Sequence, residues 1–529
     1  MSRNQFCKFQ IIIDKISELS IYFFSSIYVL LGVQFILRLY DNFAYSKNLP
    51  IFDQAIWLIS KGKTPFVTVR GVHILGDHFS SILYLFAPFY LCCPNVKLLL
   101  VAQTLAFASG AFPLYWIGIA RLKSAPVALL FSVAYLVYAP IQWSNIYEFH
   151  PETLCTPLFI YAFHYFQKAQ FSRYFVCLVI SALTKEVVGV TIIAMGLYVY
   201  YYNPRIGIKT IVLGTVAIIV SLFVMKNFSG TSSMPYFSLF SPFQRTYDGN
   251  NMLYSLDYTG ELLYPFLFLS LLSPKICLLA LPAFVANLLS HRASMQTIYF
   301  HYTVLITPFL SIAAIYGLQG LRDFGSRYVS CIVVCLLCII IVYSAINCPI
   351  IKGKYPLFRE LSRSDSEAVD SVLKQIPPSA SLSICQSIIS HSAHREKIYL
   401  FPNPFCPLLT GATELALRQL EGYDPPFQST EEMQRNLSNS TIEYIAITPF
   451  EELDSSIGKV IEEKKELLFL NPFYGIVAID KNVVLFKRNA DRISGIHTIQ
   501  IFLKNQNVKS FDAKTAFQDW LSQSRKGDI

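Results

Sequence analysis

Charged residues are scarce in this chain. Asp, Glu, Lys and Arg together make up 15% of its 529 residues, whereas 53% are hydrophobic. A water-soluble domain of this length needs far more charge to cover its surface. Aromatic residues, mostly Phe and Tyr, make up 15%, which is typical of a surface that meets lipid and headgroups. The composition excludes a soluble globular protein and indicates an integral membrane protein.

Cysteine motifs are also lacking. The sequence has 12 cysteines, but no pair has the spacing of a zinc site or a redox centre. Several cysteines lie within apolar runs, and we interpret them as small buried hydrophobic residues. Cys385 and Cys406 lie in the polar tail and would be able to pair in an oxidising compartment. The sequence leaves that pairing open.

A stripe of basic residues is absent, although the formal net charge is +9. Lys and Arg fall mainly in short loops between apolar runs, as the positive-inside rule expects for cytoplasmic loops. They do not form the clusters that bind a phosphate backbone. We therefore expect membrane lipids as partners and no nucleic acid.

A cleavage site for a signal peptide is not evident either. The first segment carries Arg3, Lys8 and Lys15 and leads into a long apolar stretch. This pattern is typical of a signal anchor whose N-terminus stays in the cytoplasm. We expect a multi-pass protein of the plasma (inner) membrane.

Apolar runs near the length of a spanning helix, about 20 residues, recur as far as residue 348. They predict a mainly α, polytopic transmembrane helical bundle of about eleven spans. The predicted spans run over residues 18–38, 97–119, 124–143, 152–168, 172–184, 187–202, 209–226, 261–273, 276–290, 302–320 and 328–348.

The loop charges give an orientation for these spans. With the N-terminus inside, every expected cytoplasmic loop carries Lys or Arg, and the first loop, 39–96, falls outside. Phe79–Cys93 is apolar but short, so we expect it to lie in the outer leaflet. We predict a transmembrane module over 1–349 and an extracytoplasmic domain over 350–529.

The tail has a different composition. It contains charged helical patterns near 359–376 and 412–438. Short strand-like runs lie at 381–385, 443–448, 474–480 and 483–488. Alternating helix and strand signals predict a small α/β domain.

Ionisable residues gather in four separate segments that this topology places on the outer side. Such residues are costly near a lipid layer and usually have a function. The segments deliver Asp41, Asp53, Gln54, His73, Asp77 and His78; Glu148, His150 and Glu152; Lys185 and Glu186; and His291, Arg292, Tyr299, His301 and Tyr302. We expect these groups to meet at one face of the bundle.

Structural roles would also explain several of these residues. Asp53 would be able to cap a surface helix, and Asp77-His78 to cap the apolar helix that follows. Lys185 and Glu186 would be able to pair with each other at a helix break.

A metal site is a further alternative for one segment. Glu148, His150 and Glu152 have side chains that bind divalent cations such as Mg²⁺ or Mn²⁺. Two carboxylates and one imidazole are a weak signature without a fourth ligand. No cofactor is otherwise indicated.

Several motifs resemble a family of prokaryotic polytopic membrane proteins known as a domain of unknown function. They lie mainly between residues 40 and 320, with one more in the tail. They are Ile51-Phe52-Asp53-Gln54-Ala55-Ile56-Trp57, Gly76-Asp77-His78-Phe79-Ser80, Ala87-Pro88-Phe89-Tyr90, Glu148-Phe149-His150-Pro151-Glu152, Lys185-Glu186, Leu281-Pro282, Tyr299-Phe300-His301-Tyr302 and His394-Arg395.

That family is similar in layout to the GT-C superfamily of polyprenyl-phosphate-sugar-dependent glycosyltransferases. The resemblance implies a GT-C-like helical bundle and an inverting glycosyltransferase. In the superfamily an acidic residue early in the first outer loop acts as the base or orients the acceptor. Asp53, expected at the start of an amphipathic helix over 53–60, matches it by position, and Asp41 is the rival.

The implied reaction transfers a sugar from a polyprenyl-phosphate donor to an unknown acceptor. Positive groups would stabilise the departing phosphate, and Lys185, Arg292 and His301 are the candidates. The expected substrate-binding groups are Gln54, Trp57, Asp77, His78, Glu148, His150, Glu152 and Glu186.

Two other functions stay open at this point. A transporter of a small polar or lipid-linked solute would place charges on broken helices and often show two related halves, but no internal repeat is visible. A non-enzymatic scaffold would bind its partner through the outer domain.

Overall fold

The computed structural model describes residues 3–46, 48–229, 249–290, 292–324, 327–352, 360–405, 430–448, 464–465, 467–468, 471–481 and 483–490. The chain divides into two compact units. Unit 1 comprises Met1–Ile36, Leu75–Leu85 and Val96–Gly353. Unit 2 comprises Leu37–Ile74, Phe86–Asn95 and Lys354–Ile529. Most of the predicted outer loop, 39–96, therefore groups with the tail. The predicted division of the chain at 349/350 stays a prediction.

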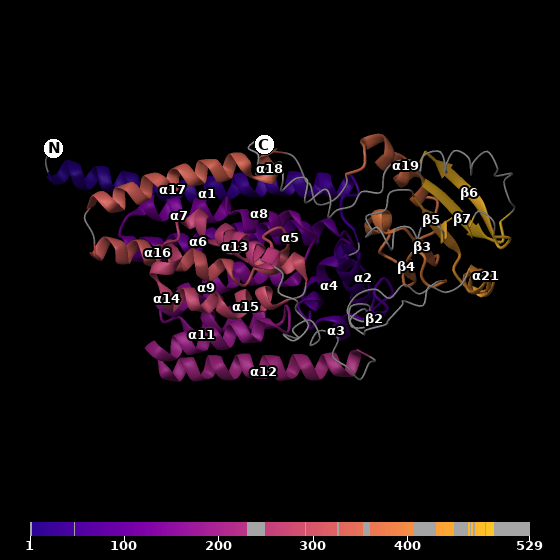
Figure 1. Cartoon of the computed structure of the whole chain (residues 1–529), viewed down its shortest axis with the longest axis horizontal. Helices are drawn as coiled ribbons and strands as arrows, with labels where there is room; N and C mark the ends of the chain where they lie inside the picture. The colour runs from indigo at the N-terminus through magenta and orange to yellow at the C-terminus, as the bar shows by residue number, and fades with distance from the viewer. Residues whose placement is uncertain are drawn as a thin grey trace. The chain divides into compact units, whose positions relative to one another are not determined.

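Unit 1 is helical, and its long helices run side by side (Figure 1). Its α-helices are α1 (Arg3–Asp41, to Ile36 in this unit), α5 (Lys97–Ser109), α6 (Ala111–Leu122), α7 (Ala125–Leu136), α8 (Ala139–Ile146), α9 (Cys155–Gln167), α10 (Phe171–Ala182), α11 (Val188–Tyr202), α12 (Pro204–Phe228), α13 (Gly249–Leu263), α14 (Pro274–Cys277), α15 (Leu281–Leu289), α16 (Thr307–Phe324), α17 (Arg327–Asn347) and α18 (Pro349–Lys352). Short 3₁₀ helices join them: η1 (Pro151–Leu154), η4 (Tyr264–Phe266), η5 (Leu269–Leu272), η6 (Leu278–Ala280), η7 (Ala293–Gln296) and η8 (His301–Thr303). Two short helices, α3 (Ile74–Asp77) and α4 (Leu83–Cys92), lie where the chain passes between the units.

The expected helical bundle is confirmed, and each predicted span coincides with helical structure. Among the described residues, three helices are long and apolar enough to cross a membrane: Phe9–Asp41, Lys97–Leu122 and Pro204–Phe228. The bent pair α7 and α8 would make a fourth. Shorter apolar helices are Leu83–Cys92, Phe171–Ala182, Val188–Tyr202, Pro274–Leu289 and Cys331–Asn347. The count of about eleven spans stays a prediction.

A proline explains the 42° bend between α7 and α8. Pro140 has no backbone N–H, and its ring clashes with the carbonyl four residues earlier, so the helix cannot continue unbroken. Because of this break, the Leu136 carbonyl has no backbone N–H of Pro140 to accept. The side-chain amide of Gln142 donates to that carbonyl instead. The break therefore leaves a satisfied backbone group inside the bundle.

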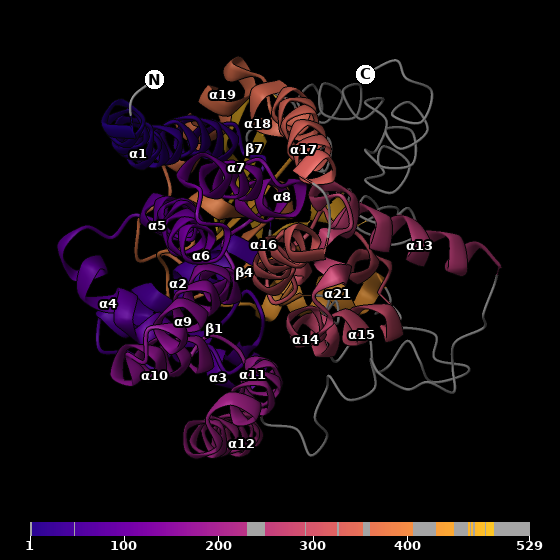
Figure 2. The same ribbon diagram turned by 90° about the vertical axis from the view of Figure 1, so that its left-hand side faces the viewer.

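Small residues allow α11 and α12 to pack closely at one edge of unit 1, as the end-on view shows (Figure 2). Gly189 and Gly196 of α11 face Gly214 and Gly207 of α12. A Cβ atom on Gly214 would lie 2.7 Å from the Gly189 carbonyl oxygen, and one on Gly207 would lie 2.3 Å from the Tyr200 Cα. Such glycine contacts are typical of helix pairs in membranes, where close van der Waals packing drives association.

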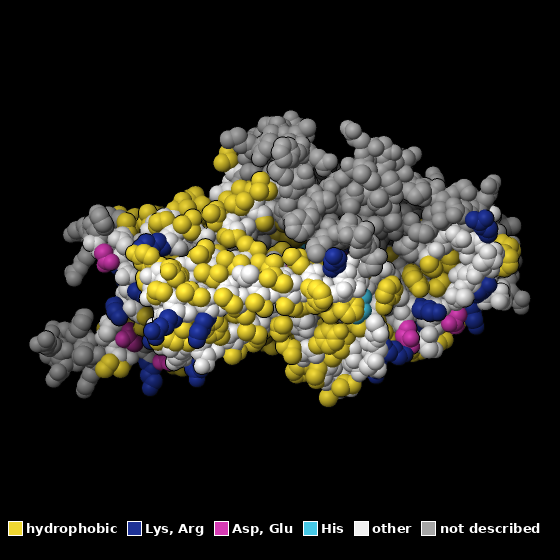
Figure 3. Space-filling view, turned by 90° about the horizontal axis from the view of Figure 1, so that it is seen from below, with side chains coloured by type: hydrophobic (Ala, Val, Ile, Leu, Met, Phe, Trp, Pro, Cys, Tyr) yellow, Lys and Arg dark blue, Asp and Glu magenta, His cyan; other side chains and the backbone are white. Residues whose placement is uncertain are grey.

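The surface of unit 1 is apolar over a broad face, with Lys and Arg gathered along one end of it (Figure 3). Large side chains that are more than half exposed include Leu197, Tyr201, Ile219, Phe223, Ile339 and Ile346. A soluble protein does not expose an apolar face of this extent. The face supports the membrane class predicted from composition.

Unit 2 contains α2 (Asn48–Ser60), the hairpin strands β1 (Phe66–Val67) and β2 (Val72–His73), and a mixed five-stranded sheet in the order β4-β3-β5-β7-β6. The strands are β3 (Leu382–Ile384), β4 (Ile398–Leu400), β5 (Tyr444–Ile447), β6 (Tyr474–Asp480) and β7 (Val483–Arg488). β3 is parallel to β4 and β5, and β7 is antiparallel to β5 and β6. α19 (Arg363–Leu373) packs on β6 and β7, and η9 (Gln386–His391) and α21 (Thr430–Asn439) complete the described part.

The sheet agrees with the strand-like runs found in the sequence. β6 and β7 have the predicted bounds, and β3 and β5 are each one residue shorter than predicted at both ends. β4 was not predicted. Of the predicted helix over 412–438, residues 412–429 lie outside the described residues, and the described remainder is in α21.

Candidate functional site

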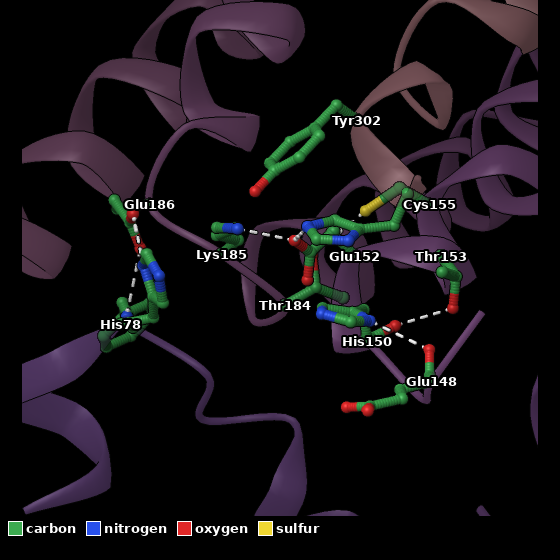
Figure 4. Close-up of polar contacts among 12 residues, drawn as sticks. His78, Glu148, His150, Glu152, Thr153, Cys155, Thr184, Lys185, Glu186 and Tyr302 are labelled. Atoms are coloured by element: carbon green, nitrogen blue, oxygen red, sulfur yellow. Dashed lines mark hydrogen bonds and ion pairs between the residues drawn. The ribbon is translucent and has the colours of Figure 1, made fainter. Parts of the chain in front are cut away.

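An ion pair between Glu152 and Lys185 lies at the centre of a polar cluster in unit 1 (Figure 4). Lys185 Nζ is 2.5 Å from Glu152 Oε1, and the two side chains are 14% and 7% exposed. Glu152 lies in η1, which begins at Pro151, and Lys185 lies in the link between α10 and α11. A buried ion pair is costly to desolvate unless further polar groups complete it.

The neighbouring residue, Glu186, faces a different partner. Its Oε1 is 2.9 Å from His78 Nδ1, and its Oε2 accepts the backbone N–H of Phe79 at 3.1 Å. The prediction that Lys185 and Glu186 pair with each other is therefore wrong, because each turns to a separate segment of unit 1. The prediction that Asp77-His78 caps the following helix is also wrong. Asp77 is the last residue of α3, α4 begins at Leu83, and His78 pairs with Glu186.

Electrostatic attraction in this cluster outweighs desolvation. The burial of the Glu152 carboxylate is compensated by two donors, Lys185 Nζ and His301 Nε2. Burial alone would lower the pKa of Lys185, but Glu152 and Glu186 raise it. The Glu186 pKa is lowered because His78 and Lys185 outweigh its burial. Glu152 and Glu186 are thus carboxylates beside an ammonium group.

Two imidazoles stack beside the ion pair. The ring centroids of His150 and His301 are 3.6 Å apart at an interplanar angle of 16°, and His301 Nε2 lies 3.2 Å from Glu152 Oε1. Burial lowers the pKa of both imidazoles. The Glu152 carboxylate acts in the opposite direction and raises the pKa of each ring, but burial outweighs it. Because the Glu152 carboxylate can only accept, His301 Nε2 is the donor in this contact. Within the described part of the chain, its buried Nδ1 has no hydrogen-bond partner.

A glutamine inside an apolar helix fixes the turn that carries these groups. Gln103 of α5 accepts the backbone N–H of His150 at 3.1 Å and the Thr153 hydroxyl at 2.9 Å. Its amide donates to the carbonyls of Ser144 and Asn145. Sequence reasoning missed Gln103, although a fully buried glutamine in Lys97–Ser109 is itself a signal of a task in a membrane helix.

Gly76 positions the segment that bears His78. A Cβ atom at Gly76 would lie 2.4 Å from the carbonyl oxygen of Phe228, at the end of α12. Only glycine permits this close approach of two backbones. The glycine of the motif Gly76-Asp77-His78 thereby holds α3 against α12 and places His78 beside Glu186.

The arrangement does not support the metal site considered from the sequence. Among the described residues, no group of three or more His, Cys, Asp or Glu side chains is placed to hold a metal ion. His150 Nδ1 faces the carbonyl oxygen of Glu148 at 2.8 Å, and Glu152 is occupied by Lys185 and His301.

Asp53 lies in unit 2, in the interior of α2. Its expected position at the start of a helix over 53–60 is wrong, because α2 begins at Asn48 and has Pro50 in its first turn, a position that suits proline. Asp53 is 2% exposed, and its Oδ1 accepts hydrogen bonds from Tyr90 Oη at 2.8 Å and His394 Nε2 at 2.9 Å. Asp41, the rival, is the last residue of α1 and is exposed.

Two other predicted residues of α2 take different parts. The Gln54 amide donates to Thr68 Oγ1 and to the Arg395 carbonyl, both at 2.9 Å, so it joins α2 to two other segments of unit 2. Trp57 stacks on His394, with ring centroids 6.0 Å apart. Sequence reasoning did not place His394 at a site.

The remaining predicted residues have less defined roles. The backbone N–H of Arg292 donates to Ser290 Oγ. Among the contacts of the described residues, none joins the Arg292 guanidinium to Glu152 or His301. His291 and Cys406 lie outside the described residues, so the Cys385–Cys406 pairing stays untested. Asp53 belongs to unit 2, and Glu148, His150 and Lys185 belong to unit 1, so their expected meeting stays a prediction.

The fold of the chain is similar to that of solved structures. The structure is similar to that of ArnT from Cupriavidus metallidurans bound to undecaprenyl phosphate, with a TM-score of 0.56 and 11% identity over 88% of this chain and 97% of that chain. It is also similar to the apo state of the same protein, with a TM-score of 0.52 and 12% identity over 89% and 98%. At these identities the likeness shows that the two proteins share a fold.

The family follows from the sequence itself. The profile of the family described as "Predicted membrane protein (DUF2079)" matches residues 38–406. The chain belongs to this family, so the membrane class inferred from composition is confirmed. A comparison with curated proteins gives no match.

Proposed function

We propose that this protein is a membrane glycosyltransferase that transfers a sugar from a polyprenyl-phosphate-linked donor to an acceptor. The observation that carries the proposal is the fold, because ArnT has the same fold and its structure was determined with undecaprenyl phosphate bound. The donor would be a polyprenyl phosphate that carries one sugar. The acceptor would supply the attacking hydroxyl or amine.

The polar cluster of unit 1 supports a phosphate-binding role. Lys185 brings a buried ammonium group, and His301 brings a ring nitrogen without a partner among the described residues. Lysine and imidazolium are donors suited to phosphate oxygens. Glu152 keeps Lys185 charged before the lipid binds, and a phosphate would then compete for the same ammonium.

Unit 2 would act on the acceptor. Its buried Asp53 takes the position that the resemblance assigns to a base or an acceptor-orienting group. Trp57 of the same helix offers an aromatic face of the kind that packs against a sugar ring. Glu148, His150, Glu186, His78 and Asp77 remain candidates for sugar contacts in unit 1.

The proposed topology places this chemistry at the outer face of the plasma membrane. About eleven spans, a cytoplasmic N-terminus and an extracytoplasmic domain after residue 349 are part of the proposal. The grouping of Lys and Arg at one end of the apolar face in Figure 3 supports that orientation. Cysteine accessibility at the loop 121–123 and in the tail would test it.

The function is tested by the lipids of a strain that lacks the protein. We expect a lipid-linked sugar to accumulate, identified by mass spectrometry of extracted polyprenyl phosphates, and to return to its normal level when the wild-type gene is restored. A lipid-linked sugar pool unchanged by the deletion would contradict the proposal. Substrate flux in proteoliposomes, with an unchanged pool, would favour a transporter instead.

A further inference from the structure

A buried carboxylate in unit 2 holds an imidazole at its surface. His394 lies in the loop between η9 and β4, and its Nε2 faces Asp53 Oδ1 at 2.9 Å. The Asp53 side chain is 3% exposed and the His394 side chain is 31% exposed. Of this pair, the imidazole is therefore the group that a substrate can reach.

Three aromatic and polar contacts fix the ring. The Trp57 indole stacks on it at an interplanar angle of 9°, and the Tyr90 ring meets it edge-on with centroids 5.9 Å apart. The Tyr90 hydroxyl donates to the same Asp53 oxygen at 2.8 Å. With Nε2 held by Asp53, Nδ1 is the ring nitrogen left for a ligand, since no hydrogen bond joins it to another described residue.

The backbone next to His394 is anchored as well. The Arg395 guanidinium, in a side chain that is largely buried, donates to the carbonyls of Ile376, Pro377 and Ala380. The Arg395 carbonyl accepts from Gln54 at 2.9 Å. A group held from both sides in this way is positioned before any substrate binds, which lowers the cost of reaching the transition state.

We propose that His394 is the catalytic base of sugar transfer and that Asp53 is its positioning residue. This inference rests on the proposed function and refines the role that the resemblance gives to Asp53. The arrangement is that of a base oriented by a third group, in which a carboxylate fixes the tautomer and stabilises the imidazolium.

The step conserves atoms and charge. The acceptor oxygen or nitrogen forms a bond to the anomeric carbon of the donor, and its proton passes to His394 Nδ1. The bond between the anomeric carbon and the phosphate oxygen breaks, and the bonding pair leaves with the polyprenyl phosphate, which gains one negative charge. Asp53 balances the positive charge on the imidazolium until the proton passes to water.

Asp53 is poorly placed to take the proton itself. Its carboxylate is buried, and Oδ1 already accepts two hydrogen bonds. A general base must come within about 2.6–3.2 Å of the proton's heavy atom. The imidazole is 31% exposed, so an acceptor can approach it while α2 keeps its position.

A structural role predicts different behaviour. If the pair served only to join α2 to the tail, any variant that folds would retain activity, and added imidazole would have no effect. Chemical rescue separates the two roles, because a small base can replace a missing proton acceptor but cannot replace a missing structural contact.

The experiment uses membranes from the deletion strain, whose accumulated lipid-linked sugar is the donor, and full-length purified protein. We expect His394→Ala to slow donor consumption at least about 100-fold, as for loss of a general base. Imidazole added in large excess over the enzyme should raise the rate of that variant at least about tenfold. Asp53→Asn is expected to be slower than wild type without rescue by imidazole.

His391→Ala is the matched control. His391 ends η9, is half-buried, stacks on Tyr40 and Phe43, and bonds to the Tyr40 carbonyl. The His391→Ala variant should have a lower free energy of unfolding, and added imidazole should not raise its rate of donor consumption. Full activity of His394→Ala, or a folded and inactive His394→Ala that imidazole does not rescue, would overturn the inference while the proposed function stands. Absence of an accumulated donor would instead overturn the proposed function.

Discussion

Lys185 Nζ, in the link between α10 and α11, and Glu152 Oε1, in η1, lie 2.5 Å apart and are separated by 33 residues of sequence. Removal of one partner from a buried pair costs about 3–5 kcal/mol, because the other charge stays buried alone. We therefore expect Lys185→Met to lower the thermal unfolding temperature of the purified protein. Lys185→Met with Glu152→Gln should recover most of that loss, and neither variant should bind radiolabelled undecaprenyl phosphate. Wild-type lipid binding by the double variant would contradict the phosphate-binding role of Lys185.

Carrier binding should depend on pH through the stacked imidazoles. Burial lowers the pKa of His150 and His301 in the free protein, and a bound phosphate would raise both by opposite charge. Binding then takes up protons, so the affinity for undecaprenyl phosphate should rise as the pH falls toward the ordinary imidazole pKa of about 6.5. His301→Gln should flatten this dependence in an equilibrium binding assay. An unchanged slope in that variant would separate His301 from the phosphate.

Close packing of α16 makes a sharp test of the fold. A Cβ atom at Gly317 would lie 1.9 Å from the Leu269 carbonyl oxygen, whereas one at Gly320, on the same helix, meets nothing within 4 Å. Gly317→Ala should cost roughly 1–3 kcal/mol through overpacking. Gly320→Ala should change the free energy of unfolding by about 1 kcal/mol or less, in the stabilising direction. Equal thermal unfolding temperatures for the two variants would mean that α16 and η5 do not pack as described.

The guanidinium of Arg395 should stabilise unit 2. It donates to three backbone carbonyls, and hydrogen bonds to charged groups contribute about 1.5–3 kcal/mol each. Arg395→Ala should therefore expose the segment around β3 and β4 to hydrogen exchange. Arg363→Ala is the control, because that side chain is 93% exposed and its pair with Glu367 is worth about 0.3–0.5 kcal/mol. Similar exchange rates in both variants would argue against the anchoring role.

Local patterns in the sequence predicted much of the fold. Apolar runs of the right length became helices, and short apolar runs bounded by polar residues became β6 and β7. Pro50 carried a signal for the start of α2 that we did not use: proline is favoured in a first helical turn, which puts the start before Asp53. β4 is three residues long, and such a short strand gives no periodicity to detect.

The sequence predicted which residues belong to the candidate sites, but it did not predict which of them pair with each other. Glu152, Lys185 and His301 were all singled out, because charge and imidazole are costly near lipid. Their pairing was missed, because opposite charges that are adjacent in sequence, such as Lys185 and Glu186, favour the interpretation that they pair with each other. The sequence gives no sign of a partner in a distant segment. His394 lies 341 residues from Asp53 along the chain, and no local spacing links them.

Unit 2 is assembled from three stretches of chain, Leu37–Ile74, Phe86–Asn95 and Lys354–Ile529. During synthesis, the first two stretches leave the ribosome long before the third. Until the last part of the chain is made, Asp53 and the apolar side of α2 lack the contacts that the third stretch provides. A fragment that begins at residue 354 would lack α2, and one that ends at residue 349 would lack the sheet. The chain therefore has to be expressed whole, and premature termination should yield a substrate for membrane proteases instead of a folded unit 2.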